Sequence, residues 1–149
     1  MDPPTNPLCN CYSLRRATRR VTQLYDHTLA PLELRATQLS LLREIDHQGP
    51  IALNQLANVM VMDRTTLGHN LRPLLQRGLI RLVEGKDRRS REVSLTGKGR
   101  NILVRGWKLW RQAQDAFEAR LGAETAAGLR RLLHRVAATE FLTAGETGC

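Results

Sequence analysis

The chain has 149 residues, a length that suits a single domain with a core large enough to fold. Its composition, 42% hydrophobic and 25% charged, is that of a soluble globular protein. No apolar run reaches the ~20 residues that a membrane span needs, and no secretory signal is visible, so we expect a cytoplasmic protein with no membrane partner.

The net charge of +9 is concentrated in one part of the chain. Residues 61–100 contain ten Lys or Arg and four Asp or Glu, which gives this stretch a charge of +6. A local excess of this kind is the electrostatic footprint of a phosphate-binding surface. Charge alone leaves open a second interpretation, a basic face that is only solvated.

The first half of the chain predicts three helices. Residues 1–8 contain three prolines and read as a disordered lead-in. The spacing of apolar residues predicts a helix over 9–29, a second from an N-cap at Thr37 to about His47, and a third over about 54–60. Gly49-Pro50 separates the second from the third.

A two-residue turn and a capping aspartate, Asp63, predict a fourth helix over 64–76, ended by Gly78. A short helix, a tight turn and a longer helix make a helix-turn-helix arrangement. Pro73 conflicts with this prediction, because an interior proline costs about 3 kcal/mol. The leucine spacing favours a helix that continues through Pro73, with or without a kink, and a break at Arg72 is the alternative.

Two short segments, 80–84 and 91–95, predict a β-hairpin with a charged tip. Their two-residue period is expected to turn Leu82, Val93 and Leu95 inward. Thr96 then caps a long helix over 97–121, and a last helix follows over about 124–142. The fold class is therefore mainly α with a small β-hairpin wing.

The terminal helices indicate a homodimer. The helices over 9–30 and 97–142 are long beside a central unit, about 37–96, that has its own core. Their apolar stripes need burial, and two-fold dimers are the commonest oligomers. We expect one domain over 9–149 that dimerises through these helices; an ordinary monomeric helical core is the alternative.

The run DRRSREVSLT, residues 87–96, resembles the wing signature of the MarR-type winged helix-turn-helix regulators. The matching positions are Asp87, Arg89, Val93, Leu95 and Thr96. Residues 63–80 resemble that family's recognition helix, and the element order matches over about 9–142. The resemblance implies an intertwined homodimer with a recognition helix in each major groove and a wing tip in each flanking minor groove. It also implies a repressor, of the kind that acts in stress responses, released by a small phenolic ligand or by cysteine oxidation.

The candidate DNA-binding residues come from the helix and the wing. Arginine can pair with guanine, asparagine with adenine, and a threonine methyl with the thymine methyl, while the helix N-terminus suits phosphate. We expect Arg89, oriented by Asp87, to enter the minor groove, and the other basic wing residues to contact phosphates. The expected partner is a pseudo-palindromic double-stranded operator. The helix candidates are Arg64, Thr65, Thr66, Gly68, His69, Asn70 and Arg72; the wing candidates are Lys86, Asp87, Arg88, Arg89 and Arg91.

The sensing residues are weighed against simpler roles. Cys9, Cys11 and Cys149 are candidates for a redox switch, but cysteine often serves as a small buried hydrophobe. Candidate liners of a pocket for a small aromatic effector are Tyr12, His27, Leu34, Trp107 and Trp110. We expect no cofactor, no metal site and no enzyme activity, because the four histidines are scattered and no catalytic constellation is present. A winged-helix module that binds an acidic protein partner is the alternative function.

Overall fold

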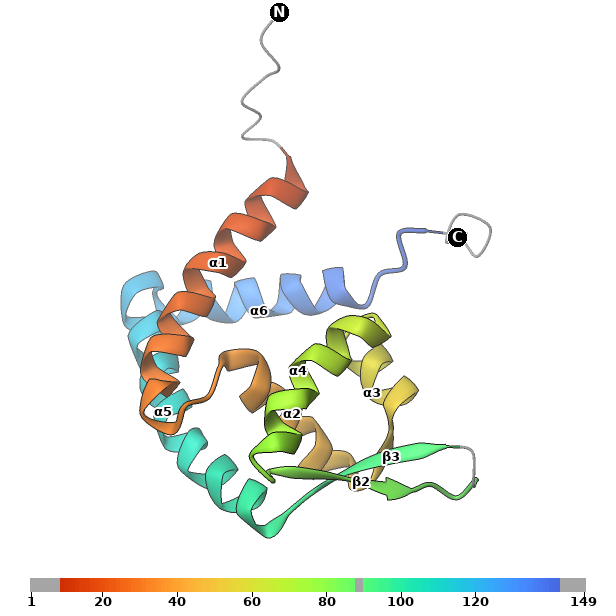
Figure 1. Ribbon diagram of the computed structural model, residues 1–149. Coiled ribbons are helices and arrows are strands. Elements are labelled where there is room, and N and C mark those ends of the chain that lie inside the picture. The colour runs from red at the N-terminus through yellow and green to blue at the C-terminus, as the bar shows by residue number, and fades with distance from the viewer. Residues whose placement is uncertain (1–8, 88–89, 143–149) are drawn as a thin grey trace, which may run out of the picture. The chain divides into compact units, whose positions relative to one another are not determined.

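The computed structural model describes residues 9–87 and 90–142. It divides into two compact units, residues up to 113 and residues from 114 onward. The helices are α1 (Asn10–Leu29), the 3-10 turn η1 (Ala30–Leu32), α2 (Ala36–Gln48), α3 (Leu53–Val59), α4 (Arg64–Gln76), α5 (Gly97–Leu121) and α6 (Ala123–Ala137); the strands are β1 (Ile51–Ala52), β2 (Ile80–Glu84) and β3 (Arg91–Leu95) (Figure 1). The predicted fold class, mainly α with a β-hairpin wing, is confirmed.

The second helix starts one residue before Thr37, the predicted cap. Its first residue, Ala36, donates its backbone N–H to Asp26 Oδ1 at 2.7 Å, and Arg35 Nη1 contacts the other carboxylate oxygen of Asp26 at 3.1 Å. The free amide at the start of α2 is therefore satisfied by a side chain ten residues earlier, on α1. Local sequence could not show this, and the prediction that Thr37 is the N-cap was wrong.

The turn of the helix-turn-helix holds a valine in an unfavourable backbone conformation. Val61 has φ 52°, in the left-handed region, and it occupies the turn position after α3 that usually carries glycine. Two hydrogen bonds close the turn. The N–H of Val61 donates to Asn58 O at 3.1 Å, and the N–H of Met62 donates to Ala57 O at 2.9 Å. A β-branched residue at such a φ is a genuine outlier.

Replacing this valine by asparagine should stabilise the protein. Because asparagine enters the left-handed region readily, we expect Val61→Asn to raise the free energy of unfolding by about 1 kcal/mol. Urea denaturation followed by circular dichroism would measure the change. Val59→Asn is the control, since Val59 is also exposed but helical; an equal gain from both would contradict the account.

Pro73 lies inside a continuous α4, and no break occurs at Arg72. The missing proline N–H would have bonded the carbonyl of His69, four residues earlier. His69 is exposed, so water can serve that carbonyl. The buried side of α4, formed by Leu67, Leu71 and Leu74, keeps its spacing.

The wing belongs to a three-stranded antiparallel sheet of order β1-β3-β2. The two longer strands have the predicted bounds, with Ile80 paired to Leu95 and Leu82 to Val93. The two-residue strand β1, which pairs Ile51 with Val93, was not predicted. Val93 and Leu95 are buried as expected, but Leu82 is 39% exposed. Leu82 lies on the same face of the sheet as its partner Val93, but because β2 is an edge strand its side chain is only partly covered.

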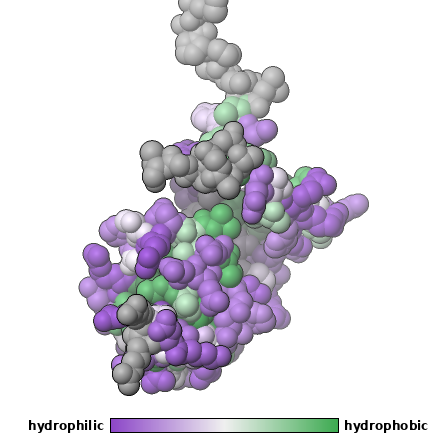
Figure 2. Space-filling view, turned by 90° about the vertical axis from the view of Figure 1, so that its right-hand side faces the viewer, coloured by the Kyte–Doolittle hydropathy of each residue, from purple (hydrophilic) through white to green (hydrophobic). Residues whose placement is uncertain are grey.

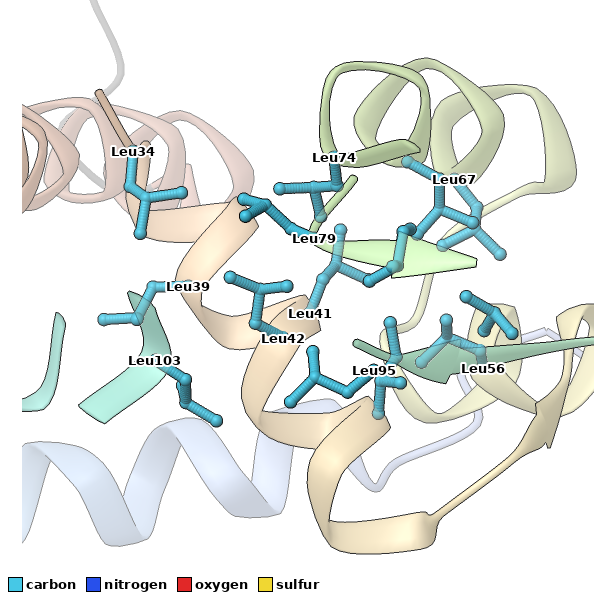
Figure 3. Close-up of a cluster of buried hydrophobic side chains, with 14 of the residues drawn as sticks. Leu34, Leu39, Leu41, Leu42, Leu56, Leu67, Leu74, Leu79, Leu95 and Leu103 are labelled. Atoms are coloured by element: carbon cyan, nitrogen blue, oxygen red, sulfur yellow. The ribbon is translucent and has the colours of Figure 1, made fainter. Parts of the chain in front are cut away.

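The core of the first unit consists mostly of leucines around α2. Leu41 and Leu42 on α2 are fully buried, and α3, α4, the sheet and the start of α5 contribute to the same cluster (Figure 3). Leu56, Leu74 and Leu79 are each 0% exposed. Helix α4 and the strands of the wing therefore pack on the same core.

Helix α5 begins at the predicted cap, where Thr96 Oγ1 accepts the N–H of Gly99 at 3.0 Å. In the second unit, Arg130 on α6 donates to Glu118 on α5 at 2.9 Å. The last helix ends at Ala137, five residues earlier than predicted. Thr139 ends it, because its hydroxyl bonds the Arg135 carbonyl at 2.7 Å and its N–H bonds Val136 O at 3.2 Å.

Candidate nucleic-acid interface

Helix α4 has one buried side and one exposed side. At 100° per residue, the buried Leu67, Leu71 and Leu74 lie opposite a stripe that contains Thr65, His69 and Arg72. All three stripe residues are exposed, and so is Gly68 at its edge; Arg64, in the first turn, is exposed on the side nearer Leu71. This stripe carries donors, a methyl group and an imidazole, which can contact base edges.

Thr66 and Asn70, which were predicted to contact bases, form hydrogen bonds within α4 and its cap instead. Thr66 donates its N–H to Asp63 Oδ1 at 2.7 Å and its hydroxyl to Asp63 Oδ2 at 2.8 Å. The amide of Asn70 donates to the Thr66 carbonyl at 2.8 Å, and Asn70 is half-buried. These contacts make Thr66 the residue that the Asp63 cap binds and turn Asn70 away from the exposed stripe.

The cap also lowers the pKa of Asp63 below its ordinary value of 3.8. The main cause is the backbone N–H of Thr66, and the Thr66 hydroxyl is the second. Because the folded-state pKa is depressed, the stabilisation is present above the unfolded pKa and is lost as pH falls through the folded pKa.

We therefore expect Asp63→Ala to lower the melting temperature at about pH 7 and to lower it less at about pH 2, because the charged form of the cap is lost as the pH falls through the depressed pKa. Thermal melts by circular dichroism at the two pH values would measure this. Asp115→Ala, which removes an exposed carboxylate from α5, is the control. A loss at pH 2 as large as that at pH 7 would show that the charge of the cap is irrelevant.

A hollow of about 350 Å³ lies between the starts of α3 and α4 and the end of the wing loop, where β3 begins. It brings Arg64 from α4 and Arg91 from β3 to one place. Two basic side chains from different elements suit a single backbone phosphate better than a base edge. Asn54 and Ser90 also line the hollow; the sequence did not single them out, because polar residues at element ends are common.

The wing tip is described only in part. Lys86, Asp87 and Arg91 are exposed. The loop is closed by Gly85 N–H on Ser90 O at 2.9 Å and Ser90 N–H on Asp87 O at 2.8 Å. Arg89, the predicted minor-groove residue, and Arg88, a predicted phosphate contact, lie outside the described residues. Figure 2 shows this side of the first unit as mainly hydrophilic, with hydrophobic residues among the polar ones.

A smaller hollow, of about 210 Å³, lies between α1, α2 and α5. Of the predicted pocket residues, Trp110 lines it and stands edge-on to Trp107, with ring centroids 4.9 Å apart. Leu34 is buried in the core, His27 is exposed, and Tyr12 is exposed with Arg16 above its ring. The full lining is Val21, Thr22, Tyr25, Leu29, Ala36, Leu39, Ser40 and Trp110.

The described cysteines lie at the start of α1. Cys9 is half-buried, and its Sγ accepts the N–H of Tyr12 at 3.5 Å; Cys11 is exposed. Cys149 lies outside the described residues. Over the described ranges, no three His, Cys, Asp or Glu side chains come together as metal ligands, and no helix is long and apolar enough to cross a membrane.

Comparison with known proteins identifies the family. The MarR family model matches residues 34–90. The M. tuberculosis transcriptional regulator MOSR, solved in complex with DNA, is 36% identical, with a TM-score of 0.78 over 87% of this chain and 93% of that one. The chain belongs to the MarR family. Its members are DNA-binding transcriptional regulators, not enzymes.

A second similar MarR-type structure is the repressor CouR. Bound to a 23-mer DNA duplex, CouR is 30% identical and covers 87% of this chain and 92% of its own, with a TM-score of 0.79. CouR bound to p-coumaroyl-CoA is 28% identical, with a TM-score of 0.77 over 89% of this chain and 94% of CouR. No curated protein matched the chain. The family model spans α2 to the wing, the part that carries the exposed stripe of α4.

Proposed function

We propose that this MarR-family regulator reads a pseudo-palindromic operator as a homodimer, with α4 in the major groove and the wing in the minor groove. The observation that carries the proposal is the pairing of the exposed α4 stripe with the arginine-lined hollow where β3 leaves the wing loop. The first supplies contacts to base edges and the second a contact to phosphate, the two components of sequence-specific binding. MOSR and CouR are both solved with DNA.

The dimer is supported by the second unit. Leu132, Leu133 and Val136 lie on one side of α6 and are 40–52% exposed. An exposed apolar stripe of this kind is normally covered by a partner. In a two-fold dimer, the α6 stripe of each copy is covered by the other copy. We propose that residues 9–30 and 97–142 dimerise and that about 37–96 bind DNA.

Sedimentation tests the dimer. The proposal predicts a species of twice 16.8 kDa at micromolar concentration. Leu133→Glu should shift it toward the monomer, and Val59→Glu, an exposed position on α3 outside the proposed dimer helices, should not. A wild-type protein that sediments only as a 16.8 kDa species would rule out the homodimer.

We further propose that the protein represses transcription in the cytoplasm. A small aromatic molecule would release the protein from its operator. Support comes from the hollow beside Trp110, whose volume suits one aromatic ring, and from CouR, a repressor solved with p-coumaroyl-CoA. Release by oxidation of Cys9 or Cys11, with Cys149, is the second candidate, supported by the exposed Cys11. Peroxide that weakens DNA binding of wild type but not of Cys11→Ser would favour oxidation over a ligand.

An electrophoretic shift assay on the DNA upstream of the gene tests the function as a whole. Binding that resists excess unrelated DNA and is weakened by a phenolic compound supports the proposal. A protein that binds acidic proteins but no duplex DNA would instead be the winged-helix interaction module.

A further inference from the structure

Arg77, at the C-terminal end of the recognition helix, has no role in the contacts with DNA described above. Its guanidinium points to the connection between α1 and α2, where Nη1 donates to Glu33 O at 2.7 Å and Nη2 to Leu32 O at 3.0 Å. The residues joined are 44 and 45 positions apart in sequence. Two charge-assisted bonds from one planar group fix direction as well as distance.

The backbone at Arg77 is fixed to the root of the wing. Its carbonyl accepts Lys98 Nζ at 2.8 Å, and the carbonyl of Gly78 accepts Thr96 Oγ1 at 2.7 Å. Arg77 is therefore the point at which the recognition helix, the wing root and the α1–α2 connection meet. A shift of that connection would be passed to the end of α4.

The α1–α2 connection, residues 30–35, is also the border of the small hollow. Leu29 directly precedes it and Ala36 directly follows it, and both line the hollow. Asp26 holds the far end through the N–H of Ala36. A group that fills the hollow would press on both ends of a connection that Arg77 bonds in its middle.

We propose that Arg77 is a positioning residue that couples this hollow to the recognition helix, so that filling the hollow changes specific DNA affinity through Arg77. The inference rests on the proposed function, because it assumes that α4 reads DNA. It adds the route by which the sensing side reaches the reading side.

A double-mutant cycle tests the coupling without an identified effector. Ala36→Leu fills the hollow from its wall, and Arg77→Met removes both bonds to the connection but keeps much of the side-chain length. The probe is a duplex that wild type selects from random sequences, and fluorescence anisotropy gives the dissociation constants. We expect Ala36→Leu to weaken binding about tenfold with Arg77 present and less than twofold in the Arg77→Met background.

The controls separate positioning from mere stability. All variants are measured at least about 15 °C below their melting temperatures, so that each of them is folded during the titration. Arg43→Met makes an equal charge change on an exposed α2 residue. It should leave the dissociation constants measured with and without Ala36→Leu unchanged. Arg77→Lys, which can bond one carbonyl, should restore part of the coupling. If Ala36→Leu does not fold, Ser40→Leu fills the same hollow.

The outcomes are distinct. Equal weakening by the filling substitution in both backgrounds, or none in either, would overturn the role of Arg77. Failure of wild type to select any duplex would instead overturn the proposed function.

Discussion

Gly99→Ala should destabilise the protein by about 3 kcal/mol, although it adds a single methyl group. A Cβ at Gly99 would overlap the carbonyl oxygen of Leu79 and lie 2.9 Å from Leu95 Cδ1. The obstacle is backbone, so it cannot move aside as a side-chain end could. The Leu79 carbonyl also accepts the N–H of Thr96 at 3.1 Å. Accommodating the methyl group would therefore separate α5 from the start of β2.

The same helix end supplies the control. Gly97 is the first residue of α5 and has open space where its Cβ would be. Gly97→Ala should be neutral or stabilise by up to about 1 kcal/mol, because alanine favours the helix. Denaturant unfolding of the two variants measures the difference. Equal stability of the two would show that close contact between α5 and Leu79 is not needed.

Arg72→Ala should weaken binding to the selected duplex by about 10- to 100-fold and relax the preference at one base pair of each half-site. Arg72 lies on the exposed α4 stripe with Thr65 and His69, where its guanidinium can reach a guanine edge. Arg64 should behave differently, since it shares a hollow with Arg91. Loss of the Arg64 side chain should weaken binding to all sequences alike. It should also reduce the slope of log affinity against log salt concentration by about one.

Anisotropy titrations with every single-base variant of the half-site separate the two roles. Arg105→Ala, an exposed arginine on α5, is the charge-matched control and should alter neither affinity nor preference. Uniform weakening by Arg72→Ala, with the base preference intact, would make Arg72 a phosphate contact and leave the base readout to other residues.

The helices and wing strands could be predicted because their signals are local. Asp63, Gly78 and Thr96 cap or end their elements within three residues, and periodicity gave the bounds of α4, β2 and β3. The errors arose where partners are distant in sequence. Asp26 caps α2 from another helix, and the strand β1 exists only through its pairing with β3.

The candidate site was predictable in residue type but less so in role. The sequence marks Thr66 and Asn70 as polar and helical, but only the structure shows that both side chains hydrogen-bond within their own helix and its cap. Arg64 and Arg91 are 27 positions apart, and no sequence pattern places them in one hollow. The bonds of Arg77 to Leu32 and Glu33 are equally invisible in a sequence, because their acceptors are backbone carbonyls.

Selection of bound duplexes from a random-sequence library by the wild-type protein tests the central claim most directly. Two copies of α4 related by two-fold symmetry predict an enriched pseudo-palindrome whose half-sites are about one helical turn, 10 base pairs, apart. Enrichment of no sequence, or of one half-site without its symmetry mate, would contradict the account.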